Sequence, residues 1–396
     1  MHIAFFMSDL GGGGTQRRLL GLAQALAEAG HRADVVVASP DGDFHDRVPS
    51  AVRLVSLAGG SIRLPFLGRR RGLRVAAVAG RLADYLEAAA PDVLLSSSNP
   101  ANLAALVARA RTAGRRSRPL PVVICVNVDL AAALAGLHRL HGGLLRTLLR
   151  RHYPQADAVV AISQGVAASV VAVAGVPSER VVTIPNPIDG AAIRRQAAMP
   201  LEHPWLAPGA PPLILAVGKL KPQKDFETLV RAFARLRAAR PANLVILGEG
   251  ERRASLVALV QHLGLGASVN LPGFDSNPYA WMARARLFVL SSRWEGFSNV
   301  LAEALAVGCP VVSTDCPSGP AELLEGGALG PLVPVGDPAA LAAAMASCLD
   351  HPCARDRLMA RAAAFSVERA AERYLALLQQ VTGAAAERAA RVGTTA

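Results

Sequence analysis

LFVLSSRWEGFSNVLAEALAVGCPVVST, residues 287–314, reads as a strand, a loop, a helix and a second strand in immediate succession. The apolar ends of this stretch are typical of buried parallel strands, and Ser298 or Asn299 can cap the helix between them. Such a strand–loop–helix turn presents backbone N–H groups and the positive end of the helix dipole to an anion. Glu295 in the loop and Glu303 in the helix add hydrogen-bond acceptors on each side of that anion. The stretch therefore predicts an α/β fold and a site for a ligand with both phosphate and hydroxyl groups, such as a nucleotide-sugar.

The alternation of apolar strands with helical stretches continues along the chain of 396 residues. This pattern predicts two α/β domains, each built on a parallel sheet, which face each other across a cleft and hold the ligand at the carboxyl ends of the strands. The expected strands are His2–Met7, Ala33–Ala38, Val52–Leu57, Asp92–Ser97, Val122–Val126, Asp157–Ile162, Val181–Ile184, Leu213–Val217, Asn243–Leu247, Ser268–Leu271, Leu287–Leu290 and Pro310–Thr314.

Changes in composition predict the domain boundaries. The first domain covers residues 1–190 and closes with the turn PNPID, and a Pro-rich linker follows over residues 191–212. The second domain covers residues 213–365. In residues 366–396, a helix from Val367 to about Gln380 precedes an Ala/Arg tail that we expect to be frayed. This helix can pack back on the first domain.

Composition limits the setting in which the protein works. Five cysteines without a CxxC pair favour free thiols in a reducing cytoplasm. The start, MHIAFFM, is too short and too uncharged at its front for a signal peptide, so we expect it to be the first strand. The longest uncharged apolar stretch, Gly165–Pro177, falls short of the roughly 18 residues of a membrane span.

The net charge of +12 is concentrated in the first half of the chain. Residues 1–200 contain 23 arginines, no lysine and 13 acidic residues, a balance of +10, and the remainder has a balance of +2. A basic half suits a negatively charged partner, although an arginine-rich surface without a partner is the alternative. The scarcity of aromatic residues among these arginines argues against nucleic acid. The leucines and arginines of Ala133–Tyr153 are typical of a helix on an anionic membrane surface, or of a core helix with an arginine rim.

All three lysines of the chain fall in one loop, GKLKPQKD, residues 218–225. Lys219 and Lys224 follow an expected strand, where a parallel sheet delivers its ligand groups, and Lys221 is the one we expect to be merely exposed. Each charge-assisted hydrogen bond to a diphosphate contributes about 1.5–3 kcal/mol. The loop therefore predicts a diphosphate site, with a solvated helix start as the alternative.

A run of four glycines, Gly11 to Gly14, separates the first strand from the first helix. Such a loop lets the main chain approach a phosphate or sugar closely, so Gly12, Gly13 and Gly14 are candidate contacts; a purely structural turn is the alternative. It is not a dinucleotide fingerprint, because Gln16 occupies the third glycine position, and a dehydrogenase is not expected. The pair Asp41 and Asp43 resembles a metal-binding motif, but its Pro and Gly neighbours favour a turn, so no metal site is predicted.

These motifs together resemble the retaining glycosyltransferases of family 4, the type with two Rossmann-like domains in the GT-B arrangement. WEGFSNVLAEALAVGCPVVST resembles their donor-binding region with its paired glutamates, and GKLKPQKDF resembles their diphosphate loop. LVILGEGERR and PNPID resemble the strand and turn that follow that loop and the connection between the domains. SDLGGGGTQRR is similar to the glycine loop of the branch that builds polysaccharides and lipid-linked oligosaccharides.

The resemblance implies a role for each part of the site. Glu303 is expected to bind the nucleotide ribose, and Glu295 the donor sugar, together with the backbone of Gly296, Phe297, Ser298 and Asn299. Lys219 and Lys224, beside Gly218, would neutralise the departing diphosphate, because fixed cations there lower the barrier to glycosyl transfer. Contacts to the base are expected at Gly273 and Phe274. Family members need neither a metal nor a cofactor, and the sugar would be transferred with retention of its configuration.

Two positions depart from the family pattern. Many relatives have arginine at the position of Lys219, so a bidentate fork is replaced here by a point charge. Many also have histidine in the loop after the strand Val122–Val126, where this chain has Asn127 and Asp129. Asn127 can position an acceptor hydroxyl, but an amide cannot act as a general base.

The sequence thus predicts a retaining glycosyltransferase with a nucleotide-diphosphate donor, most simply a UDP-sugar, and a lipid-linked or polysaccharide acceptor. We expect it on the cytoplasmic face of the membrane. Two alternatives stay open. One is a nucleotide-sugar epimerase or phosphorylase on the same scaffold, which would turn over without an acceptor, and the other is a non-catalytic nucleotide-sugar binding protein.

Overall fold

A computed structural model of the protein describes residues 1–11, 14–57, 69–116 and 118–393. The chain divides into two compact units, which are described one at a time. Unit 1 consists of Met1–Pro187 together with Val367–Ala396, and unit 2 is the continuous stretch Ile188–Ser366. The chain therefore passes from one unit to the other twice.

Unit 1 is built on a seven-stranded parallel sheet with the strand order β3-β2-β1-β4-β5-β6-β7. Its strands are β1 (His2–Met7), β2 (Arg32–Val37), β3 (Arg53–Ser56), β4 (Val93–Ser97), β5 (Val122–Val126), β6 (Ala158–Ala161) and β7 (Val181–Thr183). Its helices are α1 (Gly14–Glu28), α2 (Arg69–Ala89), α3 (Asn99–Thr112), α4 (Leu130–Ala135), α5 (Arg139–His152), α6 (Gln164–Ser169) and α15 (Val367–Gly393). The order reverses between β1 and β4, which defines a switch point at the carboxyl edge of the sheet.

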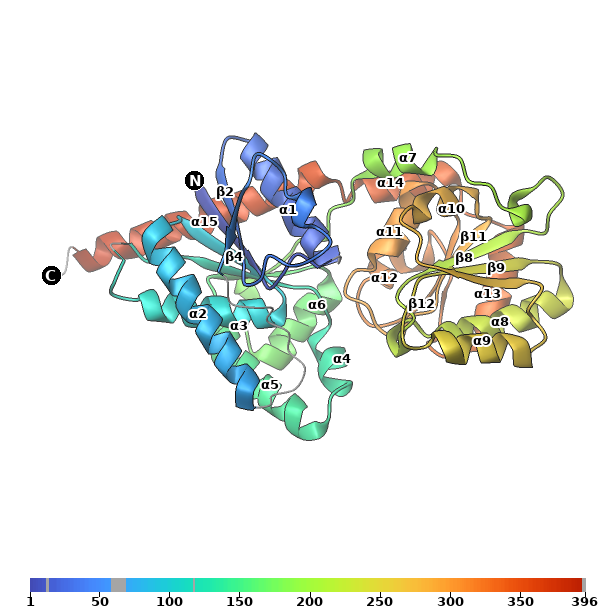
Figure 1. The fold of residues 1–396 in the computed structure, drawn as a ribbon, viewed down its shortest axis with the longest axis horizontal. Coiled ribbons are helices and arrows are strands. Elements are labelled where there is room, and N and C mark those ends of the chain that lie inside the picture. Colours follow the sequence, from blue (N-terminus) through green and yellow to red (C-terminus); the bar gives the residue numbers. More distant parts are fainter. Residues whose placement is uncertain (12–13, 58–68, 117, 394–396) are drawn as a thin grey trace. The chain divides into compact units, whose positions relative to one another are not determined.

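Helices cover both faces of this sheet, as continuous apolar strands require. Helices α1 and α15 pack on one face, and α2 and α3 pack together on the other (Figure 1). The core under α1 and α15 joins residues from both ends of the chain, among them Phe5, Leu22, Tyr374 and Leu378.

The last helix is longer than the sequence predicts. Helix α15 runs to Gly393, whereas we expected it to fray after Gln380. Val381 is 7% exposed and Ala385 is 4% exposed, so the helical pattern still buries apolar side chains in the stretch expected to be a tail. Burial of one side of the helix explains why the alanine-rich sequence stays helical there.

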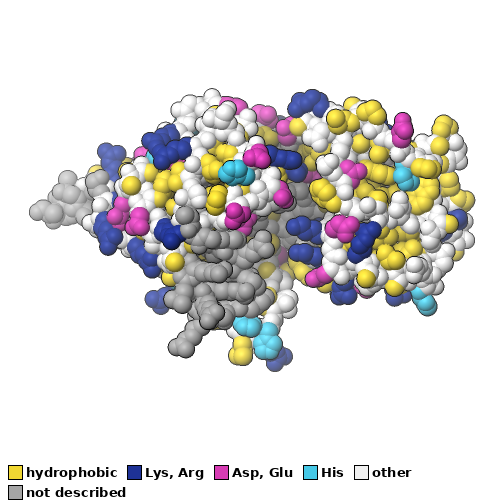
Figure 2. All heavy atoms as spheres, viewed as in Figure 1, with side chains coloured by type: hydrophobic (Ala, Val, Ile, Leu, Met, Phe, Trp, Pro, Cys, Tyr) yellow, Lys and Arg dark blue, Asp and Glu magenta, His cyan; other side chains and the backbone are white. Residues whose placement is uncertain are grey.

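Helices α4 and α5 occupy the stretch Ala133–Tyr153, with a turn at Gly136 between them. Leu149 is fully buried, but Leu140 is 78% exposed and Leu144 is 45% exposed. Apolar, histidine and basic side chains gather at the lower end of unit 1 in Figure 2, where Figure 1 places these helices. The stretch thus combines a core anchor with an exposed apolar and basic surface.

Unit 2 is built on a six-stranded parallel sheet with the strand order β10-β9-β8-β11-β12-β13. Its strands are β8 (Leu213–Val217), β9 (Asn243–Leu247), β10 (Val269–Gly273), β11 (Leu287–Leu290), β12 (Val311–Thr314) and β13 (Leu332–Val333). Its helices are α7 (Gly190–Ala197), α8 (Phe226–Ala239), α9 (Arg253–His262), α10 (Pro278–Arg284), α11 (Asn299–Ala306), α12 (Pro320–Leu323), α13 (Pro338–Asp350) and α14 (Arg355–Ala363). Its switch point lies between β8 and β11.

The stretch expected to be a linker is partly helical and belongs to unit 2. Helix α7 is capped by Asp189, whose carboxylate accepts a hydrogen bond from Ala192 N at 2.8 Å. It packs on α10 and α11, and Arg284 donates to the carbonyl oxygen of Ala197 at 3.0 Å. The Asp189 cap and the packing on α10 and α11 hold α7 on unit 2. The composition of the expected linker does not indicate this packing.

The structure confirms the predicted fold class of two parallel α/β sheets of the Rossmann type, whereas the cleft between the domains stays a prediction. All twelve expected strands are present, and the two-residue strand β13 was not predicted. The five cysteines are free thiols, and only Cys353 is partly exposed. Within the ranges that the structure covers, no helix combines the length and the apolar character needed to cross a membrane.

Candidate functional site

The carboxyl edge of the unit 2 sheet brings two of the predicted residues into contact. Lys224 follows β8 and Glu295 follows β11, the two strands that flank the switch point. The ammonium of Lys224 lies 2.5 Å from Glu295 Oε1, and Ser292 Oγ donates to the same oxygen at 2.6 Å. No side chain in the described ranges donates to Glu295 Oε2, so this second oxygen is left for a ligand.

A set of short hydrogen bonds joins the two loops that carry this pair. Ser291 Oγ donates to the carbonyl oxygen of Lys224 at 2.7 Å, and Arg293 N donates to the carbonyl oxygen of Gln223 at 2.8 Å. In return, Gln223 Nε2 donates to the carbonyl oxygen of Trp294 at 2.9 Å. Because all three bonds end on a backbone carbonyl oxygen of the opposite loop, the fold as well as the two charges fixes the distance between Lys224 and Glu295.

The loop before α11 presents unpaired donors. Gly296, Phe297 and Ser298 are buried, and their backbone N–H groups find no acceptor among the residues that the structure describes. Ser298 adopts φ +70°, ψ +74°, and its buried hydroxyl also lacks a partner there. Left-handed backbone at a non-glycine residue is strained, and buried unpaired donors are rare in folded proteins. The loop is therefore arranged to receive acceptor atoms from a ligand.

Gly319 holds this loop in place from the segment after β12. Its φ is +100°, and a Cβ at this position would lie 2.7 Å from the carbonyl oxygen of Phe297. Only glycine allows both the backbone conformation and the close approach.

Burial also affects the thiol next to the pair. Cys316 is 3% exposed, and burial together with the Glu295 carboxylate raises its pKa to about 12. The thiol is therefore protonated at neutral pH and contributes no charge to the site.

The other predicted donor residues also lie in unit 2. Glu303 is half-buried on α11 and accepts from the hydroxyl of Tyr279 at 3.4 Å. Gly273 has φ +100° at the end of β10, and Phe274 beside it is 79% exposed. Lys219 is exposed, and its ammonium forms no ion pair with a described acid. Gly218 packs against Lys224, because a Cβ there would lie 3.2 Å from Lys224 Cε.

The predicted residues of the first domain meet at the carboxyl edge of the unit 1 sheet. Gly12 and Gly13 lie outside the described residues, and Gly14 begins α1. Asn127 follows β5, and its side-chain nitrogen lies 2.8 Å from Ser97 Oγ and 3.3 Å from Thr15 Oγ1. Asp129 caps α4 by accepting from Ala132 N at 2.9 Å.

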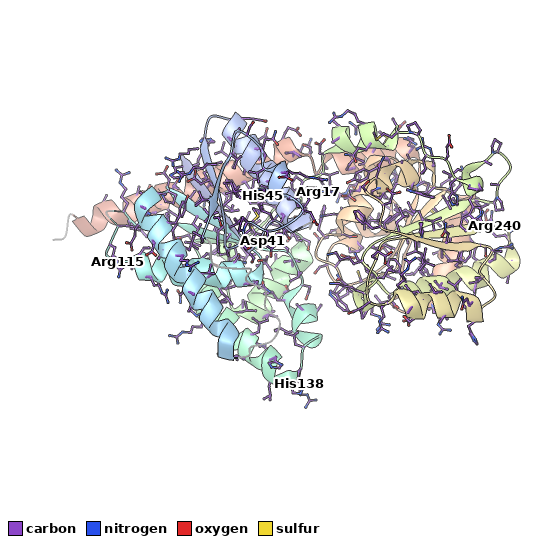
Figure 3. All side chains as sticks on the ribbon, viewed as in Figure 1. Arg17, Asp41, His45, Arg115, His138 and Arg240 are labelled. Carbon is purple, nitrogen blue, oxygen red and sulfur yellow. The ribbon has the colours of Figure 1, made fainter. Side chains whose placement is uncertain are left out.

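The aspartates considered for a metal lie in a turn. Figure 3 labels Asp41 and His45 on the loop after β2. Asp41 accepts a hydrogen bond from Ser39 Oγ at 2.5 Å, and Gly42 between the aspartates has φ +140°. Among the residues described here, no group of three or more His, Cys, Asp and Glu side chains is placed to hold a metal ion.

Several residues of these sites were missed from the sequence. Ser292 lies three residues before Glu295, and Gly319 lies between Ser318 and Pro320, five residues after β12; these positions were the available signals. Tyr279 and Arg18 gave no local signal. Arg18 is 5% exposed and donates to Ser97 Oγ at 2.7 Å, which places it directly behind Asn127.

Comparisons with known proteins agree with this architecture. The family model described as Glycosyltransferase Family 4 matches residues 12–191, and the model described as Glycosyl transferases group 1 matches residues 202–365. The two matches follow one another and together span most of the chain. The protein therefore belongs to the glycosyltransferases of the family 4 type, which confirms the resemblance drawn from the sequence motifs.

Individual relatives are more distant or match only in part. The N-acetylgalactosamine-N,N'-diacetylbacillosaminyl-diphospho-undecaprenol 4-alpha-N-acetylgalactosaminyltransferase of Campylobacter jejuni is 40% identical over 46% of this chain and 48% of its own length. The lipopolysaccharide core biosynthesis glycosyltransferase LpsE of Rhizobium meliloti is 34% identical over 43% of this chain and 51% of its own length. The chain thus spans about half the length of these curated relatives.

A solved structure shows a similar fold over nearly all of the chain. The structure of HepE from Anabaena in complex with UDP has a TM-score of 0.75 and covers 96% of this chain and 100% of its own. Its sequence identity is 22%, so this similarity concerns the fold alone.

Proposed function

We propose that this protein is a retaining glycosyltransferase that moves a sugar from a UDP-sugar to a lipid-linked or polysaccharide acceptor, without a metal or other cofactor. The observation that carries the proposal is the contact between Lys224 and Glu295 at the switch point of unit 2. It places a cation and a hydrogen-bond acceptor beside the free N–H groups of the loop before α11. A nucleotide-sugar needs these groups together, a cation for its diphosphate and acceptors for its hydroxyls.

In this proposal the charges act on the leaving group. When the bond from the anomeric carbon to the diphosphate breaks, negative charge grows on the diphosphate and positive charge on the sugar. Lys224, Lys219 and the N–H groups of the loop stabilise the first, because prearranged donors need little reorganisation during the reaction. Glu303 binds the ribose, and Gly273 and Phe274 lie where the base would be held.

Glu295 serves as a hydrogen-bond acceptor for the donor sugar rather than as a nucleophile. Its Oε1 already accepts from Lys224 and Ser292, which lowers its reactivity toward carbon. Retention then follows from attack by the acceptor hydroxyl on the face that the diphosphate leaves. The separation of two carboxylates that governs glycosidases does not apply to this site.

The acceptor and the membrane belong to the same proposal. The Campylobacter relative acts, by its name, on a diphospho-undecaprenol substrate, which is a lipid. The exposed Leu140 and Leu144 lie on α5 with Arg139 and Arg146, the composition of a helix that rests on an anionic surface. Flotation with anionic vesicles should carry the protein upward, and the double variant Leu140→Ser with Leu144→Ser should reduce this; protein that stays wholly in the dense fraction contradicts the membrane part.

The test of the donor site is thermal stabilisation by UDP, GDP and ADP, each with and without EDTA. A bound nucleotide stabilises the folded protein by roughly 2.7 kcal/mol at a hundredfold excess over Kd. We expect UDP to stabilise the protein equally with and without EDTA. No stabilisation by any nucleotide would overturn the proposal, and stabilisation only in the presence of a divalent metal would overturn the metal-free site.

A further inference from the structure

The carboxyl edge of unit 1 contains a buried cation with no carboxylate beside it. Arg18, on α1, donates from Nη2 to Ser97 Oγ at 2.7 Å and from Nη1 to the hydroxyl of Tyr374 at 3.1 Å. Arg18 is 5% exposed, and its Nε finds no acceptor in the described ranges of the chain. Among the residues that the structure describes, no acid forms an ion pair with it. Burial of a guanidinium among neutral partners is costly, because its charge is left uncompensated.

A chain of polar side chains leads from this cation to the edge of the sheet. Ser97 ends β4 and Asn127 follows β5, on the side of the switch point opposite to β2 and β3. Ser97 Oγ lies 2.8 Å from the side-chain nitrogen of Asn127, while Asn127 Oδ1 is buried and unpaired among the described residues. Arg18 is therefore two hydrogen bonds away from the half-buried Asn127.

The chemistry of Ser97 decides which end of the amide is free. A guanidinium can only donate, so Ser97 Oγ accepts from Arg18 and its own hydrogen needs an acceptor. If the Asn127 amide turns by 180°, its oxygen accepts this hydrogen and that of Thr15, and every hydroxyl is paired. The amide NH₂ then takes the buried position of Oδ1 and is the only unpaired group of Asn127; it is a donor polarised through Ser97 by a positive charge.

The backbone next to Ser97 supports a ligand site rather than a purely structural network. Ser98 has φ +88° and ψ +146°, and its side chain makes no cap bond to α3. This conformation is strained for a residue other than glycine, and such strain tends to occur where a fold positions groups for a ligand. It fixes Ser97 at the point where β4 ends.

We propose that Arg18 is a positioning residue that, through Ser97, makes the Asn127 amide an anion site in unit 1, and that this site binds the phosphate group of the acceptor. The inference rests on the proposed function, because it assigns the part of the acceptor that unit 1 recognises. An oxyanion matches both the free NH₂ donor and the uncompensated charge behind it. A sugar hydroxyl would need neither of them.

The experiment uses the full chain, saturated with UDP so that the donor site is filled, and titrates it with inorganic phosphate. The readout is the side-chain NH₂ signal of Asn127 in 1H–15N NMR spectra, assigned by its loss in Asn127→Ala. We expect a saturable shift with phosphate and none with glucose. Arg18→Gln should weaken phosphate binding about tenfold, because it removes the buried positive charge that acts on the anion through Ser97.

Three variants separate positioning from general damage. Arg115→Gln removes the same charge from the same unit near the end of α3, away from this edge, and should leave phosphate binding unchanged (Figure 3). Tyr374→Phe removes the other partner of Arg18 and should retain binding, while Arg18→Lys should restore part of it. Equal binding by Arg18→Gln and the parent, equal loss in Tyr374→Phe, a shift with glucose, or no shift with phosphate would each overturn the proposal. UDP stabilisation is measured in the same samples, so failure of the donor site is recognised separately.

Discussion

The switch points of the two sheets hold the same kind of group in opposite electrostatic settings. In unit 2, Lys224 pairs with the carboxylate of Glu295 at 2.5 Å. In unit 1, Arg18 donates to the hydroxyls of Ser97 and Tyr374, lies beside the Cys125 thiol, and has no ion pair with an acid in the described part of the chain. A paired cation becomes available to a diphosphate only in competition with its carboxylate, whereas an unpaired cation exerts its field at all times. In the proposed function, the paired cation of unit 2 acts on the diphosphate, whose charge changes during the reaction, whereas the unpaired cation of unit 1 acts on a phosphate whose charge stays constant.

Removal of the paired cation should have the largest effect. In Lys224→Ala we expect UDP binding to weaken roughly 100-fold, because two charge-assisted hydrogen bonds of about 1.5 kcal/mol each are lost. Isothermal titration calorimetry measures this, and Lys221→Ala is the matched control, since Lys221 is an exposed lysine of the same loop. Binding by Lys224→Ala within a few-fold of the parent would show that the diphosphate lies elsewhere.

Removal of the negative charge of Glu295 should leave the cation of unit 2 without an anionic partner, as Arg18 is in unit 1. Glu295→Gln keeps an acceptor for Ser292 but leaves Lys224 without an anionic partner. We expect UDP to bind as tightly as before or more tightly, while the rate of sugar transfer falls about 100-fold, because an acceptor group that acts on the transition state is weakened. Calorimetry should therefore show UDP binding that is unchanged or tighter, while a transfer assay shows the lower rate. A parallel loss of binding and rate would mean that Glu295 supports the loop rather than the reaction.

The backbone that keeps the pair in place should be sensitive to a single methyl group. In Gly319→Ala, the new Cβ would lie 2.7 Å from the Phe297 carbonyl oxygen, and alanine would have to adopt a φ of +100°. We therefore expect the free energy of unfolding to fall by about 2–3 kcal/mol. Gly326→Ala is the control, because Gly326 has φ +66° with nothing within 4 Å, and should cost about 1 kcal/mol. Equal values in urea unfolding would show that the loop before α11 yields to the added methyl group.

The smallest effect concerns the thiol beside the pair. Since burial and Glu295 raise the pKa of Cys316 to about 12, its thiolate fraction, and with it alkylation by iodoacetamide, should stay very low up to pH 9. Cys353, the partly exposed cysteine, should react first. Glu295→Gln removes one cause of the raised pKa and should accelerate alkylation of Cys316 a few-fold, as read by mass spectrometry of the peptide. An unchanged rate would place the whole effect in burial.

The comparison also separates what the sequence can predict from what it cannot. Lys224 and Glu295 could be chosen as candidates because each lies in a loop directly after its own strand, and the periodicity of strands and the chemistry of turns are local signals. Arg18 is one of many arginines, and nothing near it in sequence indicates burial. Its environment is made by Tyr374 on the last helix, so it exists only after the ends of the chain have met. The helix α7 within the expected linker was missed for a similar reason, because its partners lie on α10 and α11.

The place of α15 has a consequence for the order in which the protein can complete its cores. Every residue of unit 2 lies between Ile188 and Ser366, and its two ends are joined by a bond of 2.7 Å from Ile188 N to the carbonyl oxygen of Phe365. Unit 1 needs Tyr374 and Leu378 to close over Phe5. During synthesis on the ribosome, unit 2 can therefore finish folding before unit 1, because β1 lacks part of its packing until α15 has been made.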